Sequence, residues 1–285
     1  MPKVSVLMPI YKTKEEHLRE AIDSILSQTF EDFEFLILDD CPSDDREDIV
    51  KSYQDDRIKY IKNEHNLGIT PSRNKLIDMA KGEYLAVMDH DDISLPKRFE
   101  KQVAYLDANP SVGVVGCWVD CFPENQKLHF PSNDMEIKKL LTDICAIVHP
   151  ASMIRKSVLD ENNLHYEQMY SPSEDYCLWL RLIEYTQFYN IQEVLFNYRL
   201  HPDNTSKHQA KKMWDVTQQL HLWVRNKYPL LYQTYCLDRA ENVYIKLLKI
   251  IPFLKIRKNS TKTKVYLFNF IPLLTIQKKV KSWPK

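Results

Sequence analysis

The chain has 285 residues with 39 basic and 39 acidic side chains, so it can bury a large core and has no overall charge that would attract nucleic acid. Its four glycines form neither GxGxxG nor GxxxxGK, which excludes the glycine-rich loops that cradle phosphates. Its six scattered cysteines include no CxxC pair, and no apolar stretch reaches the roughly 18 residues of a membrane span, so we expect a reduced protein without a zinc site.

The first 90 residues alternate apolar runs with segments of helical period. Strands are predicted at 4–9, 33–40, 57–63 and 83–89, with helices at 14–28, 44–54 and 70–82 between them. In the third helix, Thr70 is the predicted N-cap and Pro71 the first helical residue. This alternation is typical of α/β proteins, and it predicts a Rossmann-like, mostly parallel sheet flanked by helices.

The remaining sequence alternates less regularly. We predict strands at 111–122 and 193–201, a strand that runs into a helix at 146–159, a helix at 171–185, and helices from about residue 206 onward. Two domains are therefore expected, residues 1–205 and a helical extension of residues 206–285. Residues 242–285 carry ten Lys, one Arg and no acidic residue, a net charge of +11 that predicts an anionic partner surface for this tail.

Polar residues gather where the predicted parallel strands end. They are Pro9 to Tyr11, Asp39 and Asp40, and Asp89 to Asp92. Because ligands of parallel sheets bind beyond the carboxyl ends of the strands, one ligand site would explain all three groups. Asp89 and Asp91 are separated by one residue, and their carboxylates can face one Mg²⁺ or Mn²⁺ that also binds substrate phosphates. The alternative is a solvated acidic loop before the helix that starts near Pro96.

Arg73 falls in the first turn of its predicted helix, where the helix dipole disfavours a cation. A bound anion at that helix end would remove the objection, and a solvated Arg is the alternative.

Several ordered motifs over about residues 3–205 resemble the family 2 glycosyltransferases, which have the GT-A fold. They are VSVLMPIYK, LILDDCPSDD, the segment NEHNLGITPSRNKLIDMAKGEYLAVMDHDD with its DxD motif, and SEDYCLWLRL. In the second motif Cys41 and Pro42 replace the usual Gly-Ser. The resemblance implies that Asp39 binds the uracil of a UDP-sugar, with Pro9 and Tyr11 lining the pocket. It places Asp89 near the ribose, Asp91 on the metal, and Arg73 at the diphosphate or ribose.

The proton from the acceptor hydroxyl needs a base, and Glu174 and Asp175 are the candidates. A capping box, with Ser171 before the helix and Glu174 in its first turn, would account for Glu174 without catalysis. The resemblance favours Asp175, since it places the base at the second acid of this pair. His201 could approach the diphosphate or the metal, and His149 matches a segment near the sugar pocket. Trp118 and Trp179 could stack on an acceptor sugar, although core packing is the alternative for Trp179.

The resemblance thus implies an inverting transferase that moves a hexose or N-acetylhexosamine from a UDP-sugar to a glycan hydroxyl, with Mn²⁺ or Mg²⁺. The alternatives are a sugar nucleotidyltransferase and a non-catalytic nucleotide-sugar-binding module. The basic tail, with its repeated IPFLKIRK and IPLLTIQK, predicts peripheral attachment to the inner face of the cell membrane, unless the two repeats are helices packed on the catalytic domain. A lipid-linked, lipooligosaccharide or capsule acceptor would suit that location. The charged residues that follow the first apolar run predict no cleavable signal, hence a cytoplasmic protein.

Overall fold

The computed structural model describes the backbone of residues 1–43, 46–202, 204–250, 254–258, 262–267 and 271–277. The chain forms two compact units, residues 1–231 and residues 232–285. The predicted division after residue 205 stays a prediction.

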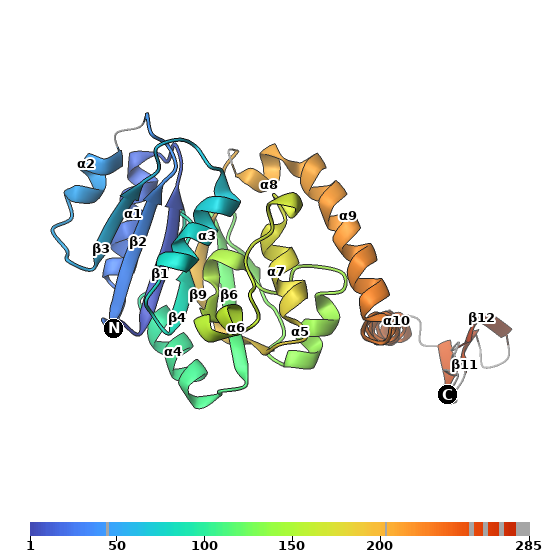
Figure 1. Cartoon of the computed structure of the whole chain (residues 1–285). Helices are drawn as coiled ribbons and strands as arrows, with labels where there is room; N and C mark the ends of the chain where they lie inside the picture. Colours follow the sequence, from blue (N-terminus) through green and yellow to red (C-terminus); the bar gives the residue numbers. More distant parts are fainter. Residues whose placement is uncertain (44–45, 203, 251–253, 259–261, 268–270, 278–285) are drawn as a thin grey trace. The chain divides into compact units, whose positions relative to one another are not determined.

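A nine-stranded sheet forms the centre of the first unit (Figure 1). Its strands are β1 (Val4–Ile10), β2 (Phe33–Asp39), β3 (Ile58–Lys62), β4 (Tyr84–Val87), β5 (Ile93–Ser94), β6 (Val112–Phe122), β7 (Gln126–Leu128), β8 (Met153–Arg155) and β9 (Gln187–Arg199). They lie in the order β3-β2-β1-β4-β8-β6-β9-β5, with β7 paired to β6. The first four strands in this order are parallel, β8 is antiparallel to both of its neighbours, and β9 is parallel to β6. The predicted α/β architecture is confirmed.

Helices cover both faces of this sheet. They are α1 (Glu15–Leu26), α2 (Arg46–Lys51), α3 (Ile69–Met79), α4 (Arg98–Ala108), α5 (Asp134–Leu140), α6 (Lys156–Glu161), α7 (Glu174–Leu182), α8 (Thr205–His208) and α9 (Ala210–Lys227), with short 3₁₀ turns η1 (His149–Ala151) and η2 (Gln168–Tyr170). Side chains of α1, α2 and α4 share one hydrophobic core, and those of α3, α5, α6, α7 and α9 share the other.

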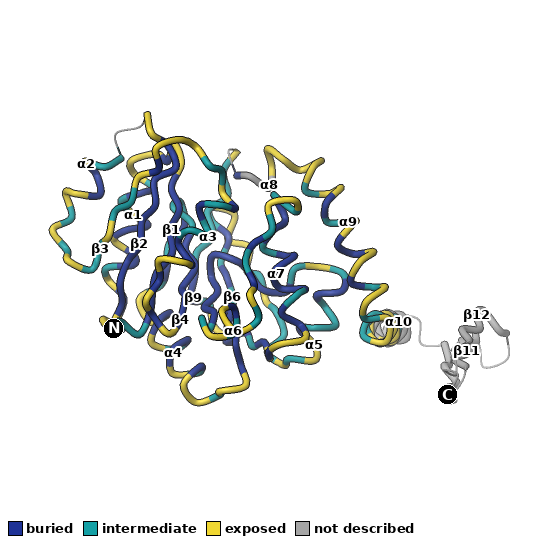
Figure 2. The backbone as a smooth tube through the Cα atoms, viewed as in Figure 1, coloured by how far each residue is buried: buried dark blue, intermediate teal, exposed yellow. Residues whose placement is uncertain are grey.

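The central strands β1 and β2 are buried because both of their faces meet helices. Every residue of β1 and β2 is buried, as the dark tube of Figure 2 shows for these strands. Along β1 the side chains alternate between the two cores, with Met8 in the core of α1 and Leu7 in the core of α3. Continuous apolar runs of this kind are typical of central parallel strands, so periodicity predicted this half of the sheet correctly.

Helix α3 begins two residues earlier than predicted. Its N-cap is Gly68, with φ +88°, a backbone conformation that glycine adopts without strain. Thr70 therefore lies inside the first turn, and the prediction that it caps the helix is wrong.

The second unit holds most of α10 (Pro229–Ile250) and an antiparallel sheet of β10 (Leu254–Lys258), β11 (Lys262–Leu267) and β12 (Ile271–Gln277), in that order. The prediction of a helical extension therefore holds as far as residue 250 and is wrong for residues 254–258, 262–267 and 271–277. Apolar and polar residues alternate in Leu-Lys-Ile-Arg, which is a strand period, and Pro272 lies on the edge strand β12, where proline is tolerated. In the described part of the chain, no helix is both long and apolar enough to cross a bilayer.

Candidate functional site

The predicted ligand residues meet where β1, β2 and β4 end. The pairing register sets Ile10 of β1 beside Asp39 of β2, and the Met88 amide after β4 donates to the Leu7 carbonyl of β1 at 3.1 Å. Pro9 is buried within β1, whereas Tyr11 directly after the strand is 44% exposed. The parallel strands therefore deliver the predicted nucleotide-binding residues to one edge of the sheet.

Asp39 is fully buried, and its carboxylate accepts hydrogen bonds from Cys41 and Tyr60. The Cys41 amide donates to Oδ1 at 2.8 Å, and the Tyr60 hydroxyl donates to Oδ2 at 2.7 Å. Cys41, which replaces a glycine of the family motif, thus binds Asp39 through its backbone and needs no particular side chain. The predicted contact of Asp39 with the uracil stays a prediction.

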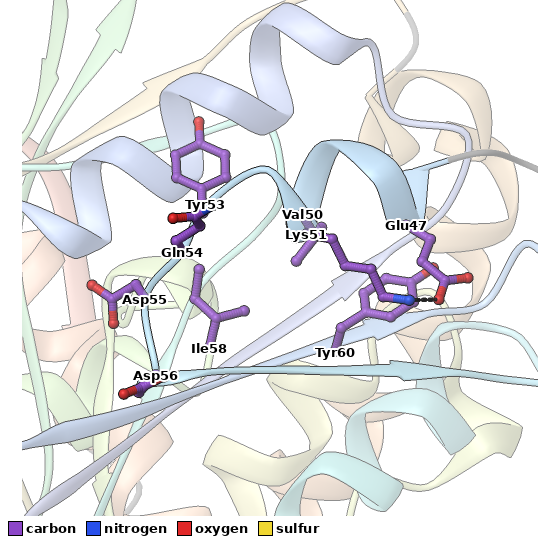
Figure 3. Close-up of a pocket in the computed structure, with 9 residues that line it drawn as sticks. All are labelled: Glu47, Val50, Lys51, Tyr53, Gln54, Asp55, Asp56, Ile58 and Tyr60. Atoms are coloured by element: carbon purple, nitrogen blue, oxygen red, sulfur yellow. Dashed lines mark ion pairs between the residues drawn. The ribbon is translucent and has the colours of Figure 1, made fainter.

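Tyr60 also lines an open hollow between α2 and β3 (Figure 3). The Lys51 ammonium and the Glu47 carboxylate form an ion pair there, 2.5 Å apart. The hollow lies at the outer strand of the sheet, and Tyr60 joins it to Asp39. The sequence did not indicate a role for Tyr60, because its contact with Asp39 arises only when β2 and β3 pair.

Asp40 organises the loop before α3, a role that sequence reasoning missed. Its carboxylate accepts from the Asn63 side chain and from the Leu67 and Gly68 amides, each at 2.8 Å. These bonds fix the segment that leads into α3, in which Arg73 is the fifth residue. The signal available in the sequence was the second acid of Asp-Asp together with the Asn-Leu-Gly turn.

Arg73 joins strand β4 to helix α7. Its guanidinium donates to the Glu174 carboxylate at 2.8 Å and to the Asp89 carboxylate at 3.2 Å. Burial alone would lower the pKa of Arg73, but Asp89 and then Glu174 outweigh it and raise that pKa. The carboxylates of Asp89 and Glu174 thus supply negative charge that offsets the cation of Arg73 near this end of the helix. The predicted diphosphate or ribose contact of Arg73 stays a prediction.

Glu174 does not form the predicted capping box. Ser173 is the N-cap of α7 and its side chain makes no capping bond, while Glu174 is buried and turned to Arg73. Its second oxygen, Oε2, is buried without a hydrogen-bond partner. The helical capping alternative for Glu174 is therefore wrong, because an Arg 101 residues away in sequence competes for the same carboxylate.

Asp175, the next residue, remains half-buried. Burial and then the neighbouring charge of Glu174 raise its pKa to about 6, although Arg73 acts in the opposite direction. A carboxylate with such a pKa is ionised at neutral pH and is a stronger base than an ordinary Asp, which suits proton abstraction.

The DxD segment meets the end of β9. The His201 Nε2 lies 2.7 Å from the Asp91 carboxylate, and the Arg199 amide donates to Asp92 at 2.7 Å. Burial opposes ionisation of Asp91, but His90 and the hydrogen bond with His201 outweigh it and lower the pKa of this carboxyl. Burial, then the charges of Asp91 and Asp89, raise the pKa of Asp92 well above its ordinary value. The pKa values of these neighbouring aspartates are thus shifted in opposite directions.

Asp91 and His201 fit a hard divalent cation whose other ligands come from the phosphates of a nucleotide. Asp91 offers carboxylate oxygens beside His201, and the His201 Nδ1 is buried without a hydrogen-bond partner. Among the described residues no group of three or more His, Cys, Asp or Glu side chains could enclose an ion. Such an ion would therefore depend on phosphate oxygens and water for most of its ligands, as Mg²⁺ commonly does.

The aromatic candidates lie elsewhere. Trp179 is fully buried in the core, and the Trp118 indole donates to the Phe130 carbonyl at 3.2 Å. His149 is buried, with Nε2 2.8 Å from the Tyr166 hydroxyl. Burial and then the charge of Arg73 lower the pKa of His149 well below its ordinary value, so this imidazole is neutral.

Comparison with known proteins identifies the family. Residues 5–162 match the model of glycosyl transferase family 2. A glycosyltransferase of Methanocaldococcus jannaschii is 40% identical over 213 residues, covering 70% of this chain and 71% of the relative. The Escherichia coli O-antigen biosynthesis glycosyltransferase WbnJ is 32% identical, covering 72% of this chain and 82% of its own.

Two solved structures share the fold. Residues 1–349 of TarS from S. aureus, in complex with UDP-GlcNAc, align with a TM-score of 0.63 and 20% identity, over 75% of this chain and 64% of that one. The mannosyltransferase PcManGT of Pyrobaculum calidifontis, in complex with GDP-Man and Mn²⁺, aligns with a TM-score of 0.56 and 14% identity, over 85% and 75%. These likenesses show the GT-A fold. The chain belongs to glycosyl transferase family 2.

Proposed function

We propose that this glycosyltransferase moves a hexose or N-acetylhexosamine, with inversion, from a UDP-sugar to a hydroxyl of a cell-surface glycan. The observation that carries the proposal is the position of Asp175, a half-buried carboxylate with a pKa raised to about 6 beside the Arg73 ion pairs that connect α7 with the strand ends. UDP-GlcNAc in TarS supports a UDP-sugar, and the O-antigen relative supports a glycan acceptor. A GDP-sugar is the competing donor, because PcManGT binds GDP-Man.

The chain's own residues have separate tasks in this reaction. Asp39 and Tyr11 bind the nucleoside, and Asp175 accepts the proton of the acceptor hydroxyl as that oxygen bonds to the anomeric carbon. The bond from this carbon to the diphosphate oxygen breaks, and the electron pair leaves with UDP. Asp91 and His201, with Asp89 nearby, would hold Mn²⁺ or Mg²⁺, which supplies positive charge for the departing diphosphate.

A panel of sugar nucleotides tests the proposal. Full-length protein with Mn²⁺ is given UDP- and GDP-linked glucose, galactose, mannose and their N-acetylated forms, and nucleoside diphosphate release is measured. We expect release from UDP-sugars that stops when EDTA is added. Release from GDP-sugars alone would contradict the UDP assignment, and binding without any turnover would favour the non-catalytic module. Formation of a sugar nucleotide from a sugar phosphate and UTP would favour the nucleotidyltransferase.

The pKa of Asp175 predicts the pH dependence of transfer. Below about pH 6 the carboxyl becomes protonated and can no longer accept the hydroxyl proton, so kcat/KM should fall tenfold per pH unit. Glu174→Gln removes the like charge that raises this pKa and should move the acid limb to lower pH. Glu167→Gln, which removes an ion-pair partner of Arg181, is the matched control and should leave the limb in place. An acid limb that stays put in Glu174→Gln would contradict this origin of the pKa.

We further propose that the basic tail attaches the enzyme to an anionic membrane surface that carries its acceptor. Each Lys or Arg close to such a surface contributes on the order of 1 kcal/mol. Deleting residues 251–285 should move the protein from the membrane to the soluble fraction after cell lysis. Replacing the five basic residues of β10 and β11 by Gln should have a smaller effect in the same direction, and high salt should reproduce it. Unchanged membrane recovery after the deletion would contradict this attachment.

A further inference from the structure

The aromatic side chain that α9 leaves in solvent is Trp214, which is 64% exposed, more than any other aromatic residue described. A single exposed apolar residue is ordinary in a soluble protein. The position of Trp214 relative to Asp175 is what makes it informative.

Helices α7 and α9 run in the same direction. The Ser173 and Thr217 hydroxyl oxygens lie 3.2 Å apart, and the rings of Tyr176 and His221 lie 5.8 Å apart. From the first contact to the second, the residue number rises by three on α7 and by four on α9, so the two helices are parallel. The first turns of the two helices therefore lie at the same end, which is the end that carries Glu174 and Asp175.

Trp214 lies one turn before Thr217, and residues three apart are neighbours on a helix surface. Helical side chains also lean toward the N-terminus of their helix. Since Thr217 touches Ser173, the N-cap of α7, the Trp214 side chain extends beyond the first turn of α7. Asp175 is two residues from that contact.

A series of contacts leads from the strand ends to Thr217 of α9, one turn after Trp214. Asp89 pairs with Arg73, Arg73 pairs with Glu174 next to Asp175, and Ser173 before them meets Thr217. The predicted nucleotide residue Asp89 is at one end of this series and Thr217 is at the other, and the first residues of α7 lie between them. A group bound at Trp214 would therefore lie near the end of α7 that carries Asp175.

The acceptor sugar fits this position chemically. A pyranose offers an apolar face of C–H groups that packs on an aromatic ring, and the rigid indole provides this contact area with little loss of side-chain freedom. We propose that Trp214 forms an acceptor subsite for a pyranose residue of the glycan that receives the sugar. This inference rests on the proposed transferase function, and it replaces Trp179 and Trp118, whose rings are taken up by the core and by the Phe130 and His129 contacts.

Binding of simple glycosides tests the subsite without catalysis. The full chain is labelled with 5-fluorotryptophan, each ¹⁹F resonance is assigned by Trp→Phe variants, and methyl β-glucoside, methyl β-galactoside and methyl β-N-acetylglucosaminide are added. We expect at least one glycoside to shift the Trp214 resonance saturably. The Trp223 resonance is the internal control and should stay in place, because Trp223 lies further along α9 against Lys227 and Tyr228.

Kinetics give the second measurement, with the octyl glycosides of the same sugars as acceptors. Trp214→Ala should raise the acceptor KM by about tenfold, Trp214→Phe should restore most of the loss, and Trp223→Ala should have no effect. Hydrolysis of the sugar nucleotide by water should be unchanged in all three variants.

Two results would overturn the subsite. One is a Trp214 resonance that no glycoside moves but anionic lipid vesicles do, which assigns the indole to a membrane surface. The other is an equal loss of hydrolysis and transfer in Trp214→Ala, which assigns it to folding. Wild-type protein that turns over no sugar nucleotide, yet shifts its Trp214 resonance with a glycoside, would contradict the proposed transferase function and leave a saccharide site.

Discussion

Replacing Asp175 by Asn should reduce sugar transfer by about 10²–10⁴-fold, the range that a positioned general base contributes. The amide has nearly the same shape as the carboxylate and can still accept the Tyr176 amide hydrogen bond that Asp175 accepts at 2.7 Å. It cannot take a proton from the acceptor hydroxyl. The loss should therefore appear in kcat, while the nucleotide, which is bound by other residues, keeps its affinity.

The measurement pairs two assays on the same protein. Transfer is followed by UDP release with the donor that the panel selects, and UDP affinity is followed by calorimetry. Asp160→Asn is the matched control, because Asp160 pairs with Lys156 on the surface of α6 at 2.7 Å and such pairs contribute about 0–1 kcal/mol. Transfer at the wild-type rate in Asp175→Asn would show that another group is the base.

Periodicity was sufficient to predict the sheet and the edge where the site lies. Apolar runs such as Val4–Ile10 can be buried on both faces only between two layers of helices, so their alternation with helical segments predicted a mostly parallel sheet. The aspartates that follow these strands then had to meet at one edge. The later strands could not be placed in this way, because β8 inserts between β4 and β6 in the antiparallel direction, and no local pattern encodes that choice.

Long-range partners explain what the sequence could not indicate within the site. The capping box expected at Glu174 used the right residue types, but a buried Arg73 offers a charge-assisted hydrogen bond that is stronger than a bond to a backbone amide. Tyr60 and Asp39 are 21 residues apart and meet through strand pairing. The error in the tail has another cause, since residues 254–258 were assigned by composition and basic charge although their period of two is that of a strand.

The largest remaining effect is expected at Asp91. Its carboxylate is paired with His201 at 2.7 Å and has a lowered pKa, so it presents full negative charge across the neutral range. Asp91→Asn keeps the shape and removes that charge. We expect about a 10²–10³-fold fall in kcat, the size of the loss when one group that stabilises a developing charge is removed. Manganese-dependent tightening of UDP binding, measured by calorimetry, should disappear with it.

Asp92 provides the control within the same turn. Burial and the adjacent charges raise its pKa well above the ordinary value, and its contact to the Arg199 amide needs only an acceptor oxygen, which Asn also provides. Asp92→Asn should therefore retain most activity and all of the manganese effect on UDP affinity. Were Asp92→Asn to lose that effect while Asp91→Asn kept it, the two aspartates would have exchanged roles. The ion would then be bound by the carboxyl that the fold buries more deeply.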